Sequence, residues 1–486
     1  MAVEVEVISK EIIKPSSPTP NHLRHHQFSY LDQIAPSIYS SLVLFFEFNG
    51  ETQPNITEIS NHLKKSLAEV LTIFYPLAGR SHYNLYIDCN DQGIPFLEAR
   101  VNYCKLSDVL HNPIPDEVNK LVPFDLVDGD NNIPLGVQLN VFECGGFAIG
   151  QCVSHKIADA LSMLMFSKAW AATTRRALGD HQVEIQHPEF VAATLFPTKL
   201  FAQQLEPRIS VAKNKVTKRF VFDASNIEVL RAKYVGIHEN QVIRRPSRFE
   251  TLSAFISSRF AAVTEYEKLH SSIHAVNLRP RFDPPLPLHY FGNLVSGAGT
   301  APSLLNTRGA CYGMARQVRE AISRIDKGYI KKLQGGAGHM SRSLTGDEVV
   351  ASFYTSLCKF PLYDNDFGWG RPSWVSVGSP GFDLFDNVVI FVDTRDADGI
   401  EACITSPKEV FTKLESDTEF LGRVRPICVG SGLSSTHHRS HLQMSGHRGN
   451  RPSMIKKPTA QTKPVTWGAG SVNLFGLAVK VLKKKL

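Results

Sequence analysis

Residues Ser154-His155-Lys156-Ile157-Ala158-Asp159-Ala160 stand between a predicted strand and a predicted helix. Upstream, two short apolar runs flank Gly145-Gly146, a pattern typical of a β-hairpin with a tight turn. Downstream, apolar residues recur at helical spacing from 158 to 177. Of the 18 histidines in the chain, only His155 is followed by aspartate at the fourth position. The pattern predicts a histidine held out toward a ligand at a strand–helix junction.

The chemistry that such a histidine suits is proton transfer. A neutral imidazole with a pKa of about 6.5 can accept a proton from an attacking alcohol or amine and return it to a leaving group. The sequence around His155 contains no nucleophile elbow, cofactor loop or metal cluster, so it predicts a general base without a covalent intermediate, a metal or a bound cofactor. The alternative is a buried histidine that serves only the core. Asp159 falls in the first helical turn, where the free N–H groups favour a carboxylate even if it has no part in catalysis.

Length and composition set the broad class of the protein. At 486 residues, with 43% hydrophobic and 20% charged residues, the chain predicts a soluble protein of two domains. The longest apolar run, 42–46, is far shorter than the ~20 residues of a membrane helix, and no secretory signal is evident. The eight cysteines form no CxxC pair, which indicates reduced thiols and predicts a cytoplasmic protein without a membrane span.

The positive charge of the chain is confined to its end. Residues 423–486 contain five Arg, seven Lys and no acidic residue, and subtracting this +12 from the total of +7 leaves −5 for residues 1–422. The body is therefore mildly acidic and has no electrostatic signature of nucleic-acid binding. The basic segment is rich in Ser, Gly, Pro and His as well, which predicts a disordered tail. A short basic amphipathic helix at its end remains an alternative.

Other patterns outline two halves of mixed helices and strands. Residues 3–7 alternate as an edge strand does, and helices are predicted at 56–74, 225–234 and 248–260. The strands expected besides the hairpin are 85–88, 95–99, 218–222, 273–278, 349–357 and 387–393. Residues 197–215 lose apolar periodicity and predict a crossover.

Two further motifs identify a family. Tyr75-Pro76-Leu77-Ala78-Gly79-Arg80 precedes the histidine motif, and Asp366-Phe367-Gly368-Trp369-Gly370 follows it. The order H-x-x-x-D then D-F-G-W-G resembles the plant BAHD acyltransferases, which use acyl-coenzyme A. Supporting matches are Leu31-Asp32-Gln33, Val276-Asn277-Leu278-Arg279, Phe291-Gly292-Asn293 and Asp393-Thr394-Arg395. The resemblance covers residues 1 to about 422.

The resemblance implies an α/β fold of two similar lobes like chloramphenicol acetyltransferase, each a mixed sheet with helices, with the active-site channel between them. It places the catalytic lobe at 1–197, the crossover linker at 198–215, the lobe with D-F-G-W-G at 216–422 and the atypical tail at 423–486. His155 would then lie in the channel between acyl-CoA and the acceptor. It would deprotonate the acceptor hydroxyl, which attacks the thioester.

The resemblance also carries roles for other residues. Asp159 is expected to form a structural ion pair, although orientation of His155 is an alternative. Asp366 is treated as a site residue and is expected to pair with Arg279 in a loop shaped by Gly368 and Gly370.

The remaining site residues concern the two substrates. Arg248, Thr251 and Ser253 open a helix that would line the CoA channel and receive phosphate, with ordinary helix capping as the alternative. Thr355 and Ser356 are expected in the acceptor pocket. Leu357 replaces a Trp frequent in related hydroxycinnamate enzymes, which weakens that substrate class.

The motifs most resemble the branch that contains vinorine synthase and salutaridinol acetyltransferase. They imply a monomeric O-acetyltransferase that takes acetyl-CoA as co-substrate and a hydroxyl of a plant specialised metabolite, an alkaloid, as acceptor. The alternatives are a terpenoid or volatile alcohol as acceptor, or a catalytically silent relative that acts as a protein partner.

Overall fold

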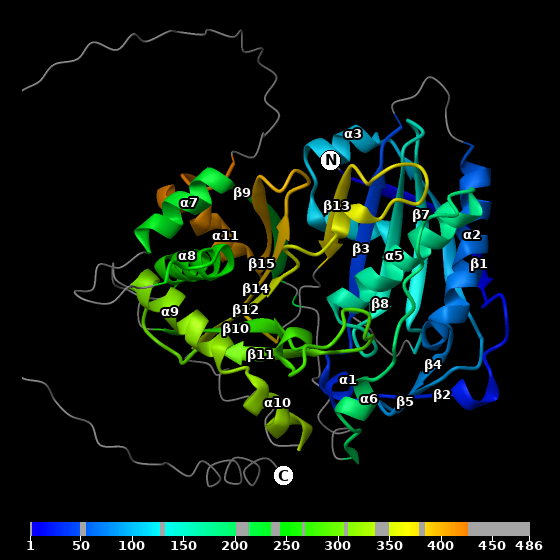
Figure 1. The fold of residues 1–486 in the computed structure, drawn as a ribbon. Coiled ribbons are helices and arrows are strands. Elements are labelled where there is room, and N and C mark those ends of the chain that lie inside the picture. The colour runs from blue at the N-terminus through cyan, green and yellow to red at the C-terminus, as the bar shows by residue number, and fades with distance from the viewer. Residues whose placement is uncertain are drawn as a thin grey trace, which may run out of the picture. The chain divides into compact units, whose positions relative to one another are not determined.

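The computed structural model describes residues 2–48, 55–126, 132–200, 212, 214–234, 244–264, 268–305, 310–335, 349–378 and 384–425. These residues form two lobes, each built on a six-stranded mixed sheet (Figure 1). The first sheet has the order β1-β6-β7-β8-β3-β13, and the second has the order β11-β10-β12-β14-β15-β9. The predicted fold class of two α/β lobes is confirmed.

The first sheet takes its strands from the first part of the chain, with one exception. Its strands are β1 (Glu4–Ile13), β6 (Ile94–Asn102), β7 (Leu135–Phe142), β8 (Phe147–Ser154), β3 (Tyr39–Phe46) and β13 (Trp374–Gly378). Side chains alternate along a strand, so β3 contributes to a core on each face of the sheet. Leu42 and Leu44 belong to the core under the long helices α2 (Ile56–Ile73) and α5 (Ala160–Ala177). Val43 and Phe45 belong to the core on the other face. The helices α3 (Leu106–His111) and α4 (Pro115–Val118) contribute to that second core.

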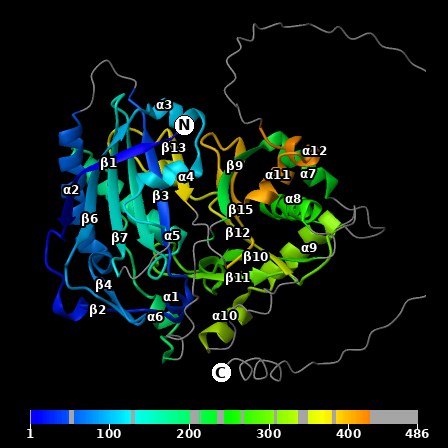
Figure 2. The same ribbon diagram turned by 180° about the vertical axis from the view of Figure 1, so that it is seen from behind.

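The second sheet pairs parallel and antiparallel strands from the rest of the chain. Its strands are β11 (Val295–Gly299), β10 (Leu269–Asn277), β12 (Val349–Ser356), β14 (Asn387–Asp393), β15 (Gly399–Pro407) and β9 (Lys215–Asp223). Helices gather along one side of this sheet in both views (Figures 1 and 2). They are α7 (Ala224–Lys233), α8 (Arg248–Val263), α9 (Ala310–Ser323), α11 (Lys408–Leu414) and α12 (Thr418–Leu421).

The uncovered face of the second sheet packs against the first lobe. Ile273, Val388 and Ile390 of the second sheet belong to the same buried cluster as Met163 of α5 and Val375 of β13. This buried apolar cluster is therefore shared by the two lobes.

Strand β13 corrects the predicted domain boundaries. It pairs antiparallel with β3, so residues 374–378 belong to the first sheet although they follow the second lobe's β12 in the chain, as the yellow arrow beside β3 shows (Figure 1). The aromatic residues just before it, Phe367 and Trp369, also pack on the first lobe, against Trp170 and Phe147 respectively. The predicted second lobe, 216–422, is thus interrupted. Of the predicted crossover 198–215, residues 201–211 and 213 lie outside the described residues.

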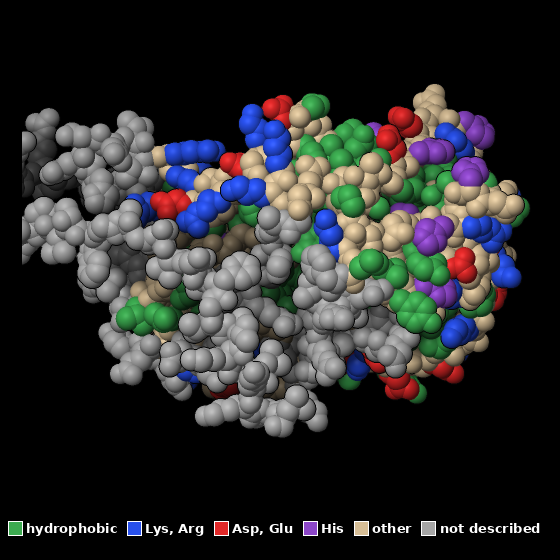
Figure 3. All heavy atoms as spheres, turned by 90° about the horizontal axis from the view of Figure 1, so that it is seen from below, with side chains coloured by type: hydrophobic (Ala, Val, Ile, Leu, Met, Phe, Trp, Pro, Cys, Tyr) green, Lys and Arg blue, Asp and Glu red, His purple; other side chains and the backbone are tan. Residues whose placement is uncertain are grey.

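A third, small sheet of β2 (His25–Gln27), β5 (Tyr86–Asp88) and β4 (Arg80–His82) lies at one end of the first lobe. In this sheet His25 and His82 stack on Tyr86. Several histidine side chains gather on the face of the molecule that Figure 3 shows. Within the described part of the chain, no group of three or more metal-binding side chains lies close enough to hold an ion. The shorter helices are α1 (Tyr30–Ile34), α6 (Ala192–Leu195) and α10 (Lys327–Gln334).

The predicted tail, 423–486, is described only as far as Arg425. Arg425 forms ion pairs with Asp223 and Asp398 of the second lobe, so the first three residues of that segment belong to the folded body. The predicted disorder and terminal helix fall outside the described residues. Among the helices that are described, none is long and apolar enough to cross a membrane.

Candidate active site

The histidine motif occupies the junction between β8 and α5, as the sequence predicts. Strand β8 ends at Ser154 and α5 begins at Ala160. The backbone N–H of His155 donates to the carbonyl oxygen of Ile38 at 2.8 Å, which anchors the junction to the chain entering β3. Asp159 is the N-cap of α5 and accepts a hydrogen bond from the backbone N–H of Ser162 at 2.9 Å. The backbone around His155 is therefore fixed on both sides.

The imidazole of His155 is held by Asn293. Nδ1 of His155 lies 3.1 Å from Oδ1 of Asn293, while the amide nitrogen of Asn293 donates to the backbone carbonyl of His155 at 2.7 Å and to Oδ1 of Asp32 at 2.8 Å. A carbonyl and a carboxylate only accept hydrogen bonds, so the atom between them must be the amide nitrogen. The amide oxygen then faces Nδ1, and Nδ1 carries the proton. In the neutral ring, Nε2 is left with a free lone pair.

The surroundings keep this ring neutral. Burial lowers the pKa of His155 below its ordinary value, because the charged imidazolium is poorly solvated there. Among the described residues, Nε2 has no hydrogen-bond partner. A neutral imidazole with an unengaged Nε2 is the form that acts as a general base.

Asp159 and Arg279 form a buried ion pair. The two lie 2.7 Å apart, the side chain of Arg279 is 0% exposed, and Arg279 also donates to the carbonyl oxygen of Tyr290. Burial alone would raise the pKa of Asp159, but Arg279 and further donors outweigh it and hold that pKa below its ordinary value. The structural ion pair expected for Asp159 is therefore present. The expectation that Arg279 pairs with Asp366 is wrong.

A pocket beside His155 lies in the core shared by the two lobes. It has a volume of about 170 Å³, smaller than the roughly 300–1,000 Å³ of sites that enclose drug-sized ligands. A space of this size accommodates part of a drug-sized molecule, not the whole of it. The first lobe contributes Ile38, Tyr39, Ser40, His155, Asp159, Ala160, Met163, Val377 and Gly378, and the second contributes Ala275, Val295, Phe353, Thr355, Leu357, Val388 and Ile390.

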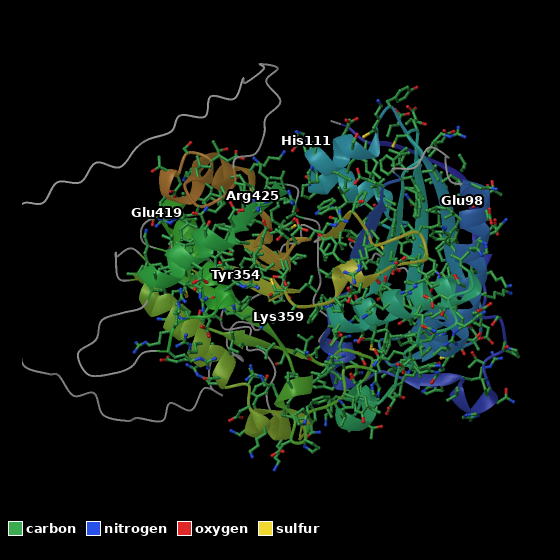
Figure 4. All side chains as sticks on the ribbon, turned by 45° about the horizontal axis from the view of Figure 1, so that its top comes forward. Glu98, His111, Tyr354, Lys359, Glu419 and Arg425 are labelled. Atoms are coloured by element: carbon green, nitrogen blue, oxygen red, sulfur yellow. The ribbon has the colours of Figure 1, made fainter. Side chains whose placement is uncertain are left out.

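Thr355 and Ser356 separate by the alternation of strand β12. Thr355 lines the pocket, as predicted, together with Phe353 and Leu357. Ser356 belongs to the other set of β12 positions with Tyr354, whose hydroxyl lies 2.6 Å from that of Ser257 on α8 (Tyr354 is labelled in Figure 4). The hydroxyl of Ser356 accepts from the backbone N–H of Cys358 instead. Its predicted place in the acceptor pocket is corrected for that reason.

The predicted phosphate-binding helix start is already capped. Ser247 is the N-cap of α8 and forms a capping box with Glu250, whose carboxylate also pairs with Arg319. Thr251 and Ser253 are 0% exposed, and the Thr251 hydroxyl donates to the carbonyl oxygen of Ser247. Helix capping thus falls to Ser247 and Glu250, while Thr251 and Ser253 are buried and do not reach the surface of the helix start.

Arg248 differs from its two neighbours because its side chain is 33% exposed. It pairs with Asp393 at 3.4 Å, and Asp393 also accepts from the backbone N–H of Lys359. Arg248 therefore remains available for the predicted CoA contact.

Asp366 shapes the loop in which it lies. Its Oδ1 accepts from the backbone N–H groups of Gly368 at 2.8 Å and Gly370 at 3.0 Å. Both glycines have positive φ, +102° and +97°, which explains why the motif has glycine there. Asp366 lines a different, polar depression with Lys168 and Arg175 of α5, and it is not among the residues around the pocket of His155.

The sequence did not reveal the role of Asn293 or Asp32. Both stood in motifs that matched the family, Phe291-Gly292-Asn293 and Leu31-Asp32-Gln33. Asn293 contacts both Asp32 and His155, which joins three segments far apart in the chain, so no local pattern shows it. The signal that could have found them is that each of these two matching motifs contains a residue able to form side-chain hydrogen bonds, Asp32 in one and Asn293 in the other.

Comparison with known proteins identifies the family of the chain. A model of the Transferase family matches residues 3–421. The chain belongs to this family. Limonoid 21-O-acetyltransferase of Melia azedarach is 36% identical over 87% of this chain and 99% of its own length. Stemmadenine O-acetyltransferase of Catharanthus roseus is likewise 36% identical, over 86% of this chain and 97% of its own.

Solved structures confirm the fold of this Transferase family member. The crystal structure of vinorine synthase superposes with a TM-score of 0.73 at 32% identity and covers 87% of this chain and 98% of its own. A Fusarium sporotrichioides TRI101 structure, solved with coenzyme A and T-2, superposes with a TM-score of 0.61 at 17% identity, over 82% of this chain and 99% of its own. The resemblance to BAHD acyltransferases is confirmed, and the chain is an enzyme of the acyl-CoA-dependent O-acyltransferase class.

Proposed function

We propose that this enzyme transfers an acetyl group from acetyl-CoA to a hydroxyl of a plant specialised metabolite, with His155 as the general base. The observation that carries the proposal is the state of His155. Its Nδ1 is bonded to Asn293, its Nε2 has no partner among the described residues, and the ring lines a pocket shared by both lobes. The curated relatives are named as O-acetyltransferases, which supports acetyl as the group transferred.

In the proposed mechanism, Nε2 of His155 takes the proton from the acceptor hydroxyl as its oxygen attacks the thioester carbonyl. The tetrahedral intermediate collapses and expels the CoA thiolate, which receives the proton from the imidazolium. Binding the two substrates on either side of one base removes much of the entropic barrier. The Thr355 hydroxyl in the pocket wall is a group available to the carbonyl oxygen, and Arg248 is our candidate contact for CoA phosphate.

The pocket wall bears on the acceptor. The carboxylate among its lining residues, Asp159, is already neutralised by Arg279, and the other lining residues, the neutral His155 included, carry no charge. A protonated amine would therefore find no counter-charge in the described wall. We infer an acceptor with an apolar skeleton, either an alkaloid whose nitrogen is neutral or lies outside the pocket, or a terpenoid alcohol.

The test is product formation by purified enzyme. Acetyl-CoA is supplied with a panel of alkaloid alcohols, terpenoid alcohols and simple volatile alcohols, and the products are detected by mass spectrometry as a gain of one acetyl group. Acetylation of a polycyclic alcohol supports the proposal. If no alcohol is acetylated with any acyl-CoA, the alternative of a catalytically silent protein partner is favoured.

We also propose that the enzyme is a cytoplasmic monomer. The six cysteines whose side chains the structure describes are all free thiols, which fits a reducing compartment. Sedimentation at micromolar concentration tests the monomer, and imaging of a fluorescent fusion tests the location.

A further inference from the structure

We propose that Asp32 is a positioning residue that sets the protonation pattern of His155 through Asn293. This inference rests on the proposed function of His155 as a base. Asp32 does not line the pocket beside His155, so any effect it has on the reaction must pass through another residue.

Asp32 holds Asn293 at two points. Its Oδ1 accepts from the backbone N–H of Asn293 at 3.1 Å and from the side-chain amide of Asn293 at 2.8 Å. The two bonds fix both the backbone and the side chain of Asn293. With its nitrogen bound to Asp32, the amide can turn only its oxygen toward Nδ1 of His155. A flipped amide would bring its oxygen against a carboxylate and against the carbonyl of His155, and its NH₂ group would favour the ring with the proton on Nε2.

The other carboxylate oxygen of Asp32 is anchored in its own helix. Oδ2 accepts from the backbone N–H of Ser29 at 2.8 Å and from the Ser29 hydroxyl at 2.6 Å, which together form the capping box of α1. Asp32 is 2% exposed. The buried carboxylate of Asp32 therefore joins α1 to Asn293. Of the four hydrogen bonds that it accepts, two come from Ser29 of the capping box and two come from Asn293.

A buried carboxylate is expensive to retain for packing alone. Burial raises the pKa of Asp32 to about 6 even though Ser29 and Asn293 donate hydrogen bonds to it. Capping of α1 does not require the bonds between Asp32 and Asn293, since the Ser29 hydroxyl alone accepts from a backbone N–H group of α1. The contact with Asn293 is what the capping role leaves unexplained.

A double-mutant cycle tests the inference. Asp32→Ala, Asn293→Ala and the double variant are compared with wild type for kcat and for the KM of acetyl-CoA. We expect each single variant to lower kcat about 10- to 100-fold with little change in KM, the range seen when a group that orients a metal-binding histidine is lost. The double variant should be no slower than Asn293→Ala, because Asp32 acts only through Asn293. Multiplicative losses would overturn the inference.

Two matched variants separate positioning from stability. Ser29→Ala removes the side-chain cap of α1 but leaves both bonds that Asn293 donates to Asp32, so it should keep kcat within about twofold while lowering the unfolding temperature. Asp32→Asn keeps one amide oxygen for Asn293, so it should recover most of the kcat that Asp32→Ala loses. A fall in kcat for Ser29→Ala as large as for Asp32→Ala would contradict the inference.

A second measurement needs no acceptor. In ¹⁵N-histidine spectra, with the His155 signals assigned by His155→Gln, wild type should show the neutral ring protonated at Nδ1. In Asp32→Ala the Nε2-protonated form should appear. An unchanged pattern in that variant would overturn the inference even if kcat falls. Absence of acetyl transfer by wild type would instead count against the proposed function alone.

Discussion

The carboxylate of Asp159 lies 2.7 Å from the guanidinium of Arg279, while the imidazole of His155, four residues before Asp159, is held by Asn293. The histidine motif therefore serves two purposes. Its aspartate ties the start of α5 to the second lobe through Arg279, and its histidine faces the pocket between the lobes. A catalytic triad of the Ser-His-Asp kind would require the aspartate to meet Nδ1, which Asn293 occupies here.

Breaking the Asp159–Arg279 pair should destabilise the protein. Arg279→Met leaves an unpaired carboxylate in a buried site, and we expect a loss of about 3–5 kcal/mol in the free energy of unfolding. The measurement is urea unfolding followed by intrinsic fluorescence. The double variant Asp159→Asn/Arg279→Met removes both charges and should recover part of the loss. If the double variant is less stable than Arg279→Met, the pair is not the source of the effect.

Asp366 should prove structural. Asp366→Ala removes the acceptor for two backbone N–H groups, so we expect a loss of about 1–3 kcal/mol in stability. In Asp366→Ala, the fall of kcat/KM at low pH should occur at the same pH as in wild type. The control is Asp364→Ala, an exposed neighbour paired with Arg371. A large loss of kcat with unchanged stability would instead indicate a catalytic role for Asp366.

The size of the pocket should limit the acceptor. Leu357→Phe adds volume to a wall of the 170 Å³ pocket, so we expect the KM of a bulky acceptor to rise about 10-fold while the KM of acetyl-CoA changes less. Steady-state kinetics with one bulky and one small alcohol measure this. Leu288→Phe, at a position 61% exposed, is the control. Equal effects of the two variants would remove Leu357 from the acceptor site.

Acid should remove activity by protonating His155. Because burial lowers the pKa of His155, the neutral base persists below its ordinary titration, and kcat/KM should fall only below about pH 6.5. Initial rates from pH 5 to 9 with saturating acetyl-CoA give the profile. An acid limb centred well above pH 7 would contradict a buried, neutral base.

The titration of Asp32 should make the free energy of unfolding depend on pH. Its pKa is raised to about 6 in the folded protein, so the folded state binds this proton more tightly than the unfolded state. The contribution of Asp32 to the free energy of unfolding therefore falls as the pH rises from about 4 to about 6. The difference in unfolding temperature, wild type minus Asp32→Asn, should decrease between pH 5 and pH 8. A difference that does not change with pH would contradict a raised pKa.

Local patterns predicted the elements of the fold well. The strand 387–393 has the predicted bounds, and α2, α5, α8 and the hairpin of β7 and β8 follow hydrophobic periods that packing reinforces. Thr355 was found because it lies on a predicted strand. Ser356 was placed wrongly because the register of β12 against its neighbours, and not its own sequence, decides which face meets the pocket.

Long-range contacts were beyond the sequence. Strand β13 joins the first sheet through pairing with β3, more than 320 positions earlier, and no turn signal marks that crossing. The partner of Arg279 was misassigned for the same reason, since a buried arginine can meet any carboxylate that the fold brings to it. Asn293 acquires its role only where three segments meet.

The measurement that tests the account most directly is release of CoA thiol by wild type and by His155→Ala, at matched unfolding temperature, with acetyl-CoA and an acceptor alcohol. Wild type should release thiol only when the acceptor is present, and His155→Ala should be slower by about 10²- to 10⁴-fold, the range for loss of a general base. Equal rates of acceptor-dependent release by the two proteins would contradict the assignment of His155 as the base.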